Sequence, residues 1–158
     1  MPLEHLSPAV QNIIASVRLR HPDGHLRYAG AVTPDETYLL MQESGVKLID
    51  VRSRAEWVWV GRIAGSHLVP WSHFTESGLV RNERFVDELK AVAAPDDVLL
   101  MLCRSSKRSK PAAEAAVAAG FANTFDILEG FEGDPDPEGR RNTVDGWRFR
   151  GLPWRLEM

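Results

Sequence analysis

The sequence predicts an α/β domain with an open, mostly parallel, twisted sheet and helices on both of its faces. Two short apolar runs, at 47–51 and 97–102, resemble buried parallel strands that end in charged or polar residues. Between them, residues 82–93 repeat apolar side chains at helical spacing. The order is therefore strand, helix, strand, and this alternation is typical of open α/β sheets.

The amino-terminal part predicts less structure. Residues 1–32 have irregular apolar spacing and a turn at 21–24, so we expect an extension with one helix near 8–18. The remaining domain, 33–158, begins with a helix, because the hydroxyl of Thr33 precedes a proline and two acids. That helix is expected to end near Gly45.

The later elements follow the same α/β order. In the helix at 82–93, Asn82 is a candidate cap, and one face carries Phe85, Val86, Leu89 and Val92. Residues 111–119 are nearly all alanine and predict a helix that packs closely on the sheet, followed by a strand at 124–128. A long polar loop at 129–145 and an aromatic tail that docks on the body complete the chain.

Composition limits the partners. The chain has 158 residues, 44% of them hydrophobic and 26% charged, with a net charge of -3. These values predict one globular domain and give no general reason to expect nucleic acid or a membrane as partner. No apolar run approaches the roughly 18 residues of a membrane span, and the first residues lack a signal-peptide order, so we expect a cytoplasmic protein.

Cys103 is the only cysteine, which excludes an internal disulfide and every zinc pattern that needs a cysteine pair. The five histidines show no helical metal-binding spacing. We therefore predict neither a metal nor another cofactor, and the value of this cysteine would be as a thiol.

The predicted strand ends locate the chemistry. Ligands of open α/β sheets bind at the carboxyl ends of the strands, and three ends deliver Arg52, Cys103 and the segment 129–131. Only the second carries a nucleophile. After Cys103 come four cations and three hydroxyls, namely Arg104, Ser105, Ser106, Lys107, Arg108, Ser109 and Lys110.

This segment resembles an anion cradle. Pro111 is tolerated only near a helix start, which places the first helical residue at about Arg108 or later and leaves 103–108 as a loop. Its backbone N–H groups, the helix dipole and Arg108 would favour a Cys103 thiolate. The alternative is a buried core cysteine beside a solvated basic surface. Four cations at a helix start, where positive charge is unfavourable, indicate an anion instead.

With these motifs the chain resembles the rhodanese family over roughly 32–153. The similar segments are 48–52 followed by Glu56 and Trp57, the glycine-rich 61–70, the six-residue loop at 103–108 and Trp147 with 151–153. The resemblance implies a sulfurtransferase in which Cys103 carries sulfur as a persulfide. The donor would be thiosulfate or a similar anion, held by Arg104, Lys107 and Arg108, and the acceptor cyanide, a dithiol or a protein thiol.

Two other functions stay open. A related group of phosphatases has Cys-x5-Arg, whereas Cys103 and Arg108 here form the shorter Cys-x4-Arg, which suits sulfur better than a phosphoryl group. The other alternative is a catalytically weak, partner-binding module. It arises because Ser106 stands where the family usually has glycine, and a positive φ there would strain the loop by on the order of 1 kcal/mol.

The remaining motif residues have supporting roles in this interpretation. Asp50 and Arg52 are expected to pair with each other, or with Glu56 and Arg62, and so to hold the loops. Phe131 is a candidate wall of the pocket. Turns are expected at Gly61 and Gly65, packing roles for Trp57, Trp59 and Trp71, and an unusual pocket wall from Glu129-Gly130, where the family often has two glycines.

Overall fold

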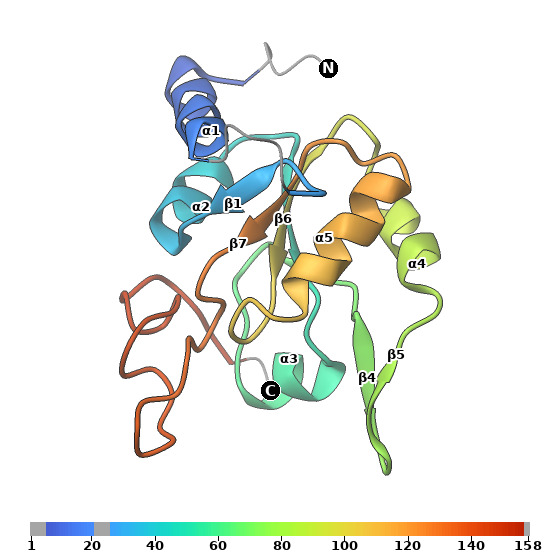
Figure 1. Cartoon of the computed structure of the whole chain (residues 1–158), viewed down its shortest axis with the longest axis vertical. Helices are drawn as coiled ribbons and strands as arrows, with labels where there is room; N and C mark the ends of the chain where they lie inside the picture. Colours follow the sequence, from blue (N-terminus) through green and yellow to red (C-terminus); the bar gives the residue numbers. More distant parts are fainter. Residues whose placement is uncertain (1–5, 21–25, 157–158) are drawn as a thin grey trace.

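The computed structural model describes residues 6–20 and 26–156 and has a five-stranded sheet at its centre (Figure 1). All its pairings are parallel, in the order β1-β7-β6-β2-β3. The strands are β1 (Gly30–Val32), β2 (Val46–Asp50), β3 (His67–Leu68), β6 (Val98–Leu102) and β7 (Thr124–Ile127). This arrangement confirms the predicted parallel α/β class.

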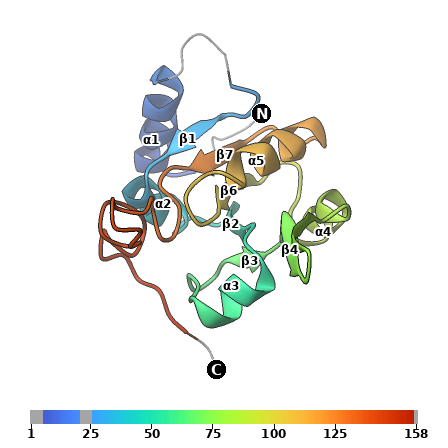
Figure 2. The same ribbon diagram turned by 60° about the horizontal axis from the view of Figure 1, so that its bottom comes forward.

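Helices cover both faces of the sheet, as predicted (Figure 2). The helices are α1 (Pro8–Leu19), α2 (Pro34–Leu40), α3 (Arg54–Trp59), α4 (Phe85–Val92) and α5 (Ser109–Ala118). Helices α1 and α2 pack on one face, and α4 and α5 on the other. None of the helices in the described ranges is long and apolar enough to cross a membrane.

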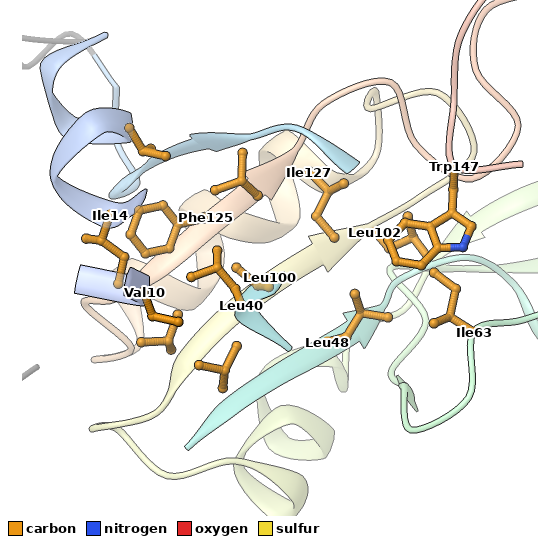
Figure 3. Close-up of a cluster of buried hydrophobic side chains, with 14 of the residues drawn as sticks. Val10, Ile14, Leu40, Leu48, Ile63, Leu100, Leu102, Phe125, Ile127 and Trp147 are labelled. Atoms are coloured by element: carbon orange, nitrogen blue, oxygen red, sulfur yellow. The ribbon is translucent and has the colours of Figure 1, made fainter. Parts of the chain in front are cut away.

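Strand β6 shows how the sequence makes two cores. Alternate side chains of a strand point to opposite faces. Leu100 and Leu102 therefore join Ile14 of α1 and Phe125 on one side (Figure 3), while Leu99 and Met101 join α4 and α5 on the other. All five residues of β6 are buried, which explains why this segment of the sequence is continuously apolar.

Thr33 begins α2 with a capping box. Its hydroxyl accepts from the N–H of Glu36, and the Glu36 carboxylate accepts from the N–H of Thr33. The expected end near Gly45 is wrong, because the helix ends at Leu40 and turns connect it to β2.

The amino-terminal helix has its predicted place, but β1 was not expected. Residues 30–32 pair with β7 and are fully part of the sheet, and α1 buries Val10, Ile14 and Val17 against the core. Three residues are too few for a periodic signal. The predicted turn at 21–24 lies outside the described residues.

Other short elements also lacked a sequence signal. Ser53 caps the six-residue α3, and β4 (Ser72–Thr75) pairs with β5 (Gly78–Arg81) in a separate antiparallel hairpin. In α4, Asn82 does accept the N–H of Arg84, although the cap position itself is Arg84.

After β7, residues 129–145 form a loop without helix or strand, and the aromatic tail packs on the domain. Trp147 is fully buried in the core, and its indole N–H donates to the carbonyl of Pro153. Trp154 meets Phe131 edge to face with ring centroids 6.1 Å apart.

Candidate active site

Cys103 lies directly after β6, at the carboxyl end of the sheet, where the strand order predicts a ligand site. Its carbonyl accepts the N–H of Phe131, which ties the loop to the segment after β7. The residue is 1% exposed, and its thiol donates to the Ser109 hydroxyl across an Sγ–Oγ distance of 3.4 Å. Ser109 is the first residue of α5, so the loop does span 103–108.

Ser106 has a φ of 72°, in the left-handed region that favours glycine. This confirms the conformational condition on which the strain argument rested. The serine side chain is well bonded, however: its hydroxyl donates to Asp126 at 2.7 Å and accepts from the ammonium group of Lys110 at 2.8 Å. The departure from glycine therefore adds two contacts that glycine cannot make.

Glu129, the second residue that stands where the family often has glycine, also combines a positive φ with side-chain bonds. It has a φ of 70°, and its carboxylate accepts from the N–H of Gly146 and pairs with Arg150. At Gly130, by contrast, a Cβ atom would lie 2.4 Å from the carbonyl oxygen of Arg104, so only glycine fits beside the loop. Half-buried Ser105 lies at the same contact, through its backbone nitrogen.

Asp126 is the functional candidate that sequence reasoning missed. It lies in β7, has a fully buried side chain, and accepts hydrogen bonds from Ser106 and Ser109, with the Lys110 ammonium 3.2 Å away. Burial is the largest influence and raises the pKa of Asp126 above its ordinary value, against the effect of these donors. The only signal in the sequence was an acid inside a predicted buried strand.

Both arginines of the loop are already paired with carboxylates. The Arg108 guanidinium donates two hydrogen bonds to Glu56, at 2.7 and 2.8 Å, and Arg104 donates to Glu132 at 2.9 Å. Burial alone would raise the pKa of Glu56, but the hydrogen bonds and charge of Arg108 outweigh it and lower the pKa. Lys107 is exposed and makes no ion pair with another residue in the described ranges.

Asp50 and Arg52 form a buried pair, one of the arrangements expected for these residues. Both side chains are fully buried, with an Nη2–Oδ2 distance of 2.7 Å, and Arg52 also donates to the carbonyl of Gly61. Glu56 instead joins Arg108, while Arg62 lies over the ring of Trp57 at 4.8 Å.

One aromatic residue differs from expectation, and the role of Phe131 as a pocket wall stays a prediction. The Phe131 ring is fully buried under the guanidinium of Arg52, 4.4 Å from its centroid, so it supports the ion pair from the core. Trp59 is 73% exposed, so its predicted packing role is wrong. Trp71 does pack, edge to face on Phe85.

A cleft of about 380 Å³ adjoins the loop. Its polar wall has the two ion pairs, Arg104 with Glu132 and Arg108 with Glu56. The apolar wall comes from α3 and the β4–β5 hairpin, through Ala55, Trp59, Val60, Phe74 and Leu79. The cleft offers a substrate charged groups on one side and apolar surface on the other.

Comparison with known proteins agrees with this geometry. The rhodanese-like domain family matches residues 33–133. The chain is 31% identical over 120 residues to RP600, an uncharacterised protein of Rickettsia prowazekii, covering 75% of this chain and 89% of that protein. It is 30% identical over 91 residues to thiosulfate sulfurtransferase 18 of Arabidopsis thaliana, covering 56% of this chain and 66% of the relative.

A solved structure has a similar fold. The crystal structure of Rv0390 from M. tuberculosis superposes with a TM-score of 0.71 at 37% identity, covering 82% of this chain and 99% of that one. The fold and the site thus define an α/β protein with a cysteine at the carboxyl end of a central strand. The chain belongs to the rhodanese-like domain family.

Proposed function

We propose that this protein is a sulfurtransferase that moves sulfane sulfur from thiosulfate or a similar anionic donor to a thiophilic acceptor through a Cys103 persulfide. The observation that carries the proposal is the position of the only cysteine, at the first place of a six-residue loop between β6 and α5. The similarity to two Arabidopsis proteins described as thiosulfate sulfurtransferases 16 and 18 supports the same reaction.

The proposed transfer has two steps. The Cys103 thiolate attacks the outer sulfur of thiosulfate, a new S–S bond forms, and the old S–S bond breaks as sulfite leaves with its electron pair. Cyanide, a dithiol or a protein thiol then attacks the outer persulfide sulfur and releases the Cys103 thiolate. No metal or redox cofactor enters either step.

The surroundings of the loop support an anionic donor. Lys107 is exposed, and the Arg104 side chain is 45% exposed while it pairs with Glu132. Both cations can therefore approach a donor from solvent. Arg108 is held by Glu56 and stabilises the loop as well as the developing charge at sulfur.

One observation favours the alternative of a catalytically weak binding module. Cys103 is 1% exposed, and the two arginines beside it are already neutralised by carboxylates. In that case the cleft beside the loop would bind a partner without chemistry. Thiosulfate turnover separates the two functions.

The experiment is sulfur loading of the whole protein. With thiosulfate and no acceptor, the intact mass should rise by one sulfur atom, and cyanide or dithiothreitol should remove it. Double-reciprocal plots should be parallel, and Cys103→Ser should abolish loading without unfolding the protein. Serine forms no persulfide, so residual transfer in that variant would contradict the mechanism. A wild type that binds anions but never loads would support the binding module.

The cytoplasmic location of the protein stays a prediction.

A further inference from the structure

A continuous chain of hydrogen bonds leads from the Cys103 sulfur to a buried carboxylate that sulfur transfer itself does not require. The thiol donates to Ser109 across 3.4 Å, and the Ser109 hydroxyl donates to Asp126 Oδ1 across 2.5 Å. All three side chains are at most 1% exposed. Their positions are fixed by β6, by the first residue of α5 and by β7.

The groups that face Asp126 come from three segments. The loop supplies the Ser106 hydroxyl, α5 supplies Ser109 and Lys110, and the segment before β1 supplies Tyr28. Burial and then the negative charge of Asp126 raise the pKa of Tyr28, so the tyrosine remains neutral near the carboxylate.

The charge on Asp126 is therefore weakly compensated. No guanidinium among the described residues pairs with it, and the one ammonium group, on Lys110, is 46% exposed. A carboxylate in such surroundings has a raised pKa because burial disfavours its charged form. It is a better proton acceptor than an exposed aspartate.

We propose that Ser109 and Asp126 form a proton relay in which the thiol proton of Cys103 moves to Ser109 as the Ser109 proton moves to Asp126. This inference rests on the proposed function, since a persulfide forms from the thiolate. The S–H and Ser109 O–H bonds break, and a new Ser109 O–H and an Asp126 O–H bond form. The products are a thiolate, an intact hydroxyl and a neutral carboxyl group, with no other reactant.

The relay solves an electrostatic problem of the site. A buried thiolate beside a buried carboxylate would place two negative charges in the protein interior, and Arg108, the guanidinium that acts on the sulfur, is already paired with Glu56, so this state is costly. Proton transfer along the chain keeps the total charge constant. It also reverses both hydrogen bonds, so that the Ser109 hydroxyl then donates to the thiolate. Ser109 touches the reacting sulfur, whereas Asp126 is a positioning residue that acts through Ser109.

The test is the pH profile of Cys103 alkylation by iodoacetamide in the full chain. The wild-type rate should rise in two steps, the lower when Asp126 loses its proton and the upper when the thiol loses its proton to water. Asp126→Asn should remove the lower step and slow alkylation between the two steps on the order of 10²-fold. Ser109→Ala should give the same profile, since the relay is then interrupted.

Two further variants separate a relay from a merely structural role. Lys110→Met removes a cation that favours the charged carboxylate, so the lower step should move to higher pH. Glu83→Gln, the same carboxylate-to-amide change at an exposed site before α4, should leave the profile unchanged. Circular dichroism and the thermal midpoint establish folding of each variant.

A single step in wild type, with the same profile in Asp126→Asn and in Ser109→Ala, would overturn the relay. Intact-mass loading from thiosulfate is measured separately on the same samples. A two-step profile without any loading would support the relay and contradict the proposed function. Loading together with a one-step profile would support the proposed function and contradict the relay.

Discussion

Two carboxylates hold the loop at 103–108 from different sides, and their environments shift their pKa values in opposite directions. Glu56 of α3 accepts two hydrogen bonds from the Arg108 guanidinium, and its pKa is lowered. Asp126 of β7 accepts from two serine hydroxyls and lies near Lys110, and its pKa is raised. In both cases burial is the largest single influence and favours the neutral acid.

The difference shows what makes one buried carboxylate a fixed partner of an ion pair and the other a proton acceptor. A guanidinium fork supplies two charge-assisted hydrogen bonds and outweighs burial at Glu56. Hydroxyls carry no net charge, and the Lys110 side chain, which is 46% exposed, is screened by water, so burial prevails at Asp126. The same functional group thus fixes the loop on one side and can exchange a proton on the other.

The largest expected effect is the contrast in stability between Glu56→Gln and Asp126→Asn. Loss of the Glu56 charge leaves the Arg108 guanidinium partly buried without an anion and should lower the free energy of unfolding by about 2–3 kcal/mol. Asp126→Asn removes a charge that burial disfavours and should cost about 1 kcal/mol or less. Urea unfolding at pH 7 measures both, with Glu83→Gln as control. A larger loss for Asp126→Asn would break the comparison.

Substitutions of Ser106 test the hydrogen bonds that Asp126 accepts. Ser106→Ala keeps the strained backbone but removes the bond to Asp126, and should lower the free energy of unfolding by about 2 kcal/mol. Ser106→Gly removes the same bond but also relieves the left-handed strain, so its net change should stay within about 1 kcal/mol of wild type. Equal losses in the two variants, measured by urea unfolding, would show that the positive φ costs nothing.

The pH dependence of stability should have opposite signs for the two acids. Because the pKa of Asp126 is raised, the native state holds its proton more tightly, and this residue contributes stability that falls as pH rises from 3.8, its ordinary pKa, through the folded value. The pKa of Glu56 is lowered, so its contribution is present above its ordinary 4.5 and is lost as pH falls through the folded value.

Each slope is at most about 1.4 kcal/mol per pH unit. Unfolding curves between pH 7 and pH 3 therefore measure the contribution of each acid as the difference in unfolding free energy between wild type and the variant that lacks it. Wild type should gain stability relative to Asp126→Asn as pH falls, and should lose it relative to Glu56→Gln. Slopes of the same sign in the two comparisons would contradict the assignment.

The smallest stability change is expected for Arg104→Ala. Its ion pair with Glu132 is 45% exposed on the arginine side, and such pairs contribute about 1 kcal/mol or less. The variant should instead raise the half-saturating thiosulfate concentration, more at low than at high salt. Arg108→Ala should raise it as well but also destabilise the protein. Unchanged kinetics in both would assign the two arginines to structural support alone.

The sequence was sufficient for the sheet class, the two central strands and the placement of Cys103, because continuous apolar runs and strand ends are local signals. It was insufficient for contacts between distant residues. Arg108 and Glu56 are 52 positions apart, and the fold alone brings them together. Asp126 escaped notice because one acid in a four-residue strand has no periodicity to mark it. The strand at 30–32 was missed for the same reason.

That short strand links the amino-terminal segment to the surroundings of Asp126. Its central residue, Ala31, lies in register with Asp126, so β7 is an interior strand and not a solvent-facing edge. The family match begins at residue 33, immediately after β1. A chain shortened to the matched residues would lose this neighbour and admit water to the backbone of β7. A segment that carries no catalytic motif therefore helps to exclude water from the strand that carries Asp126.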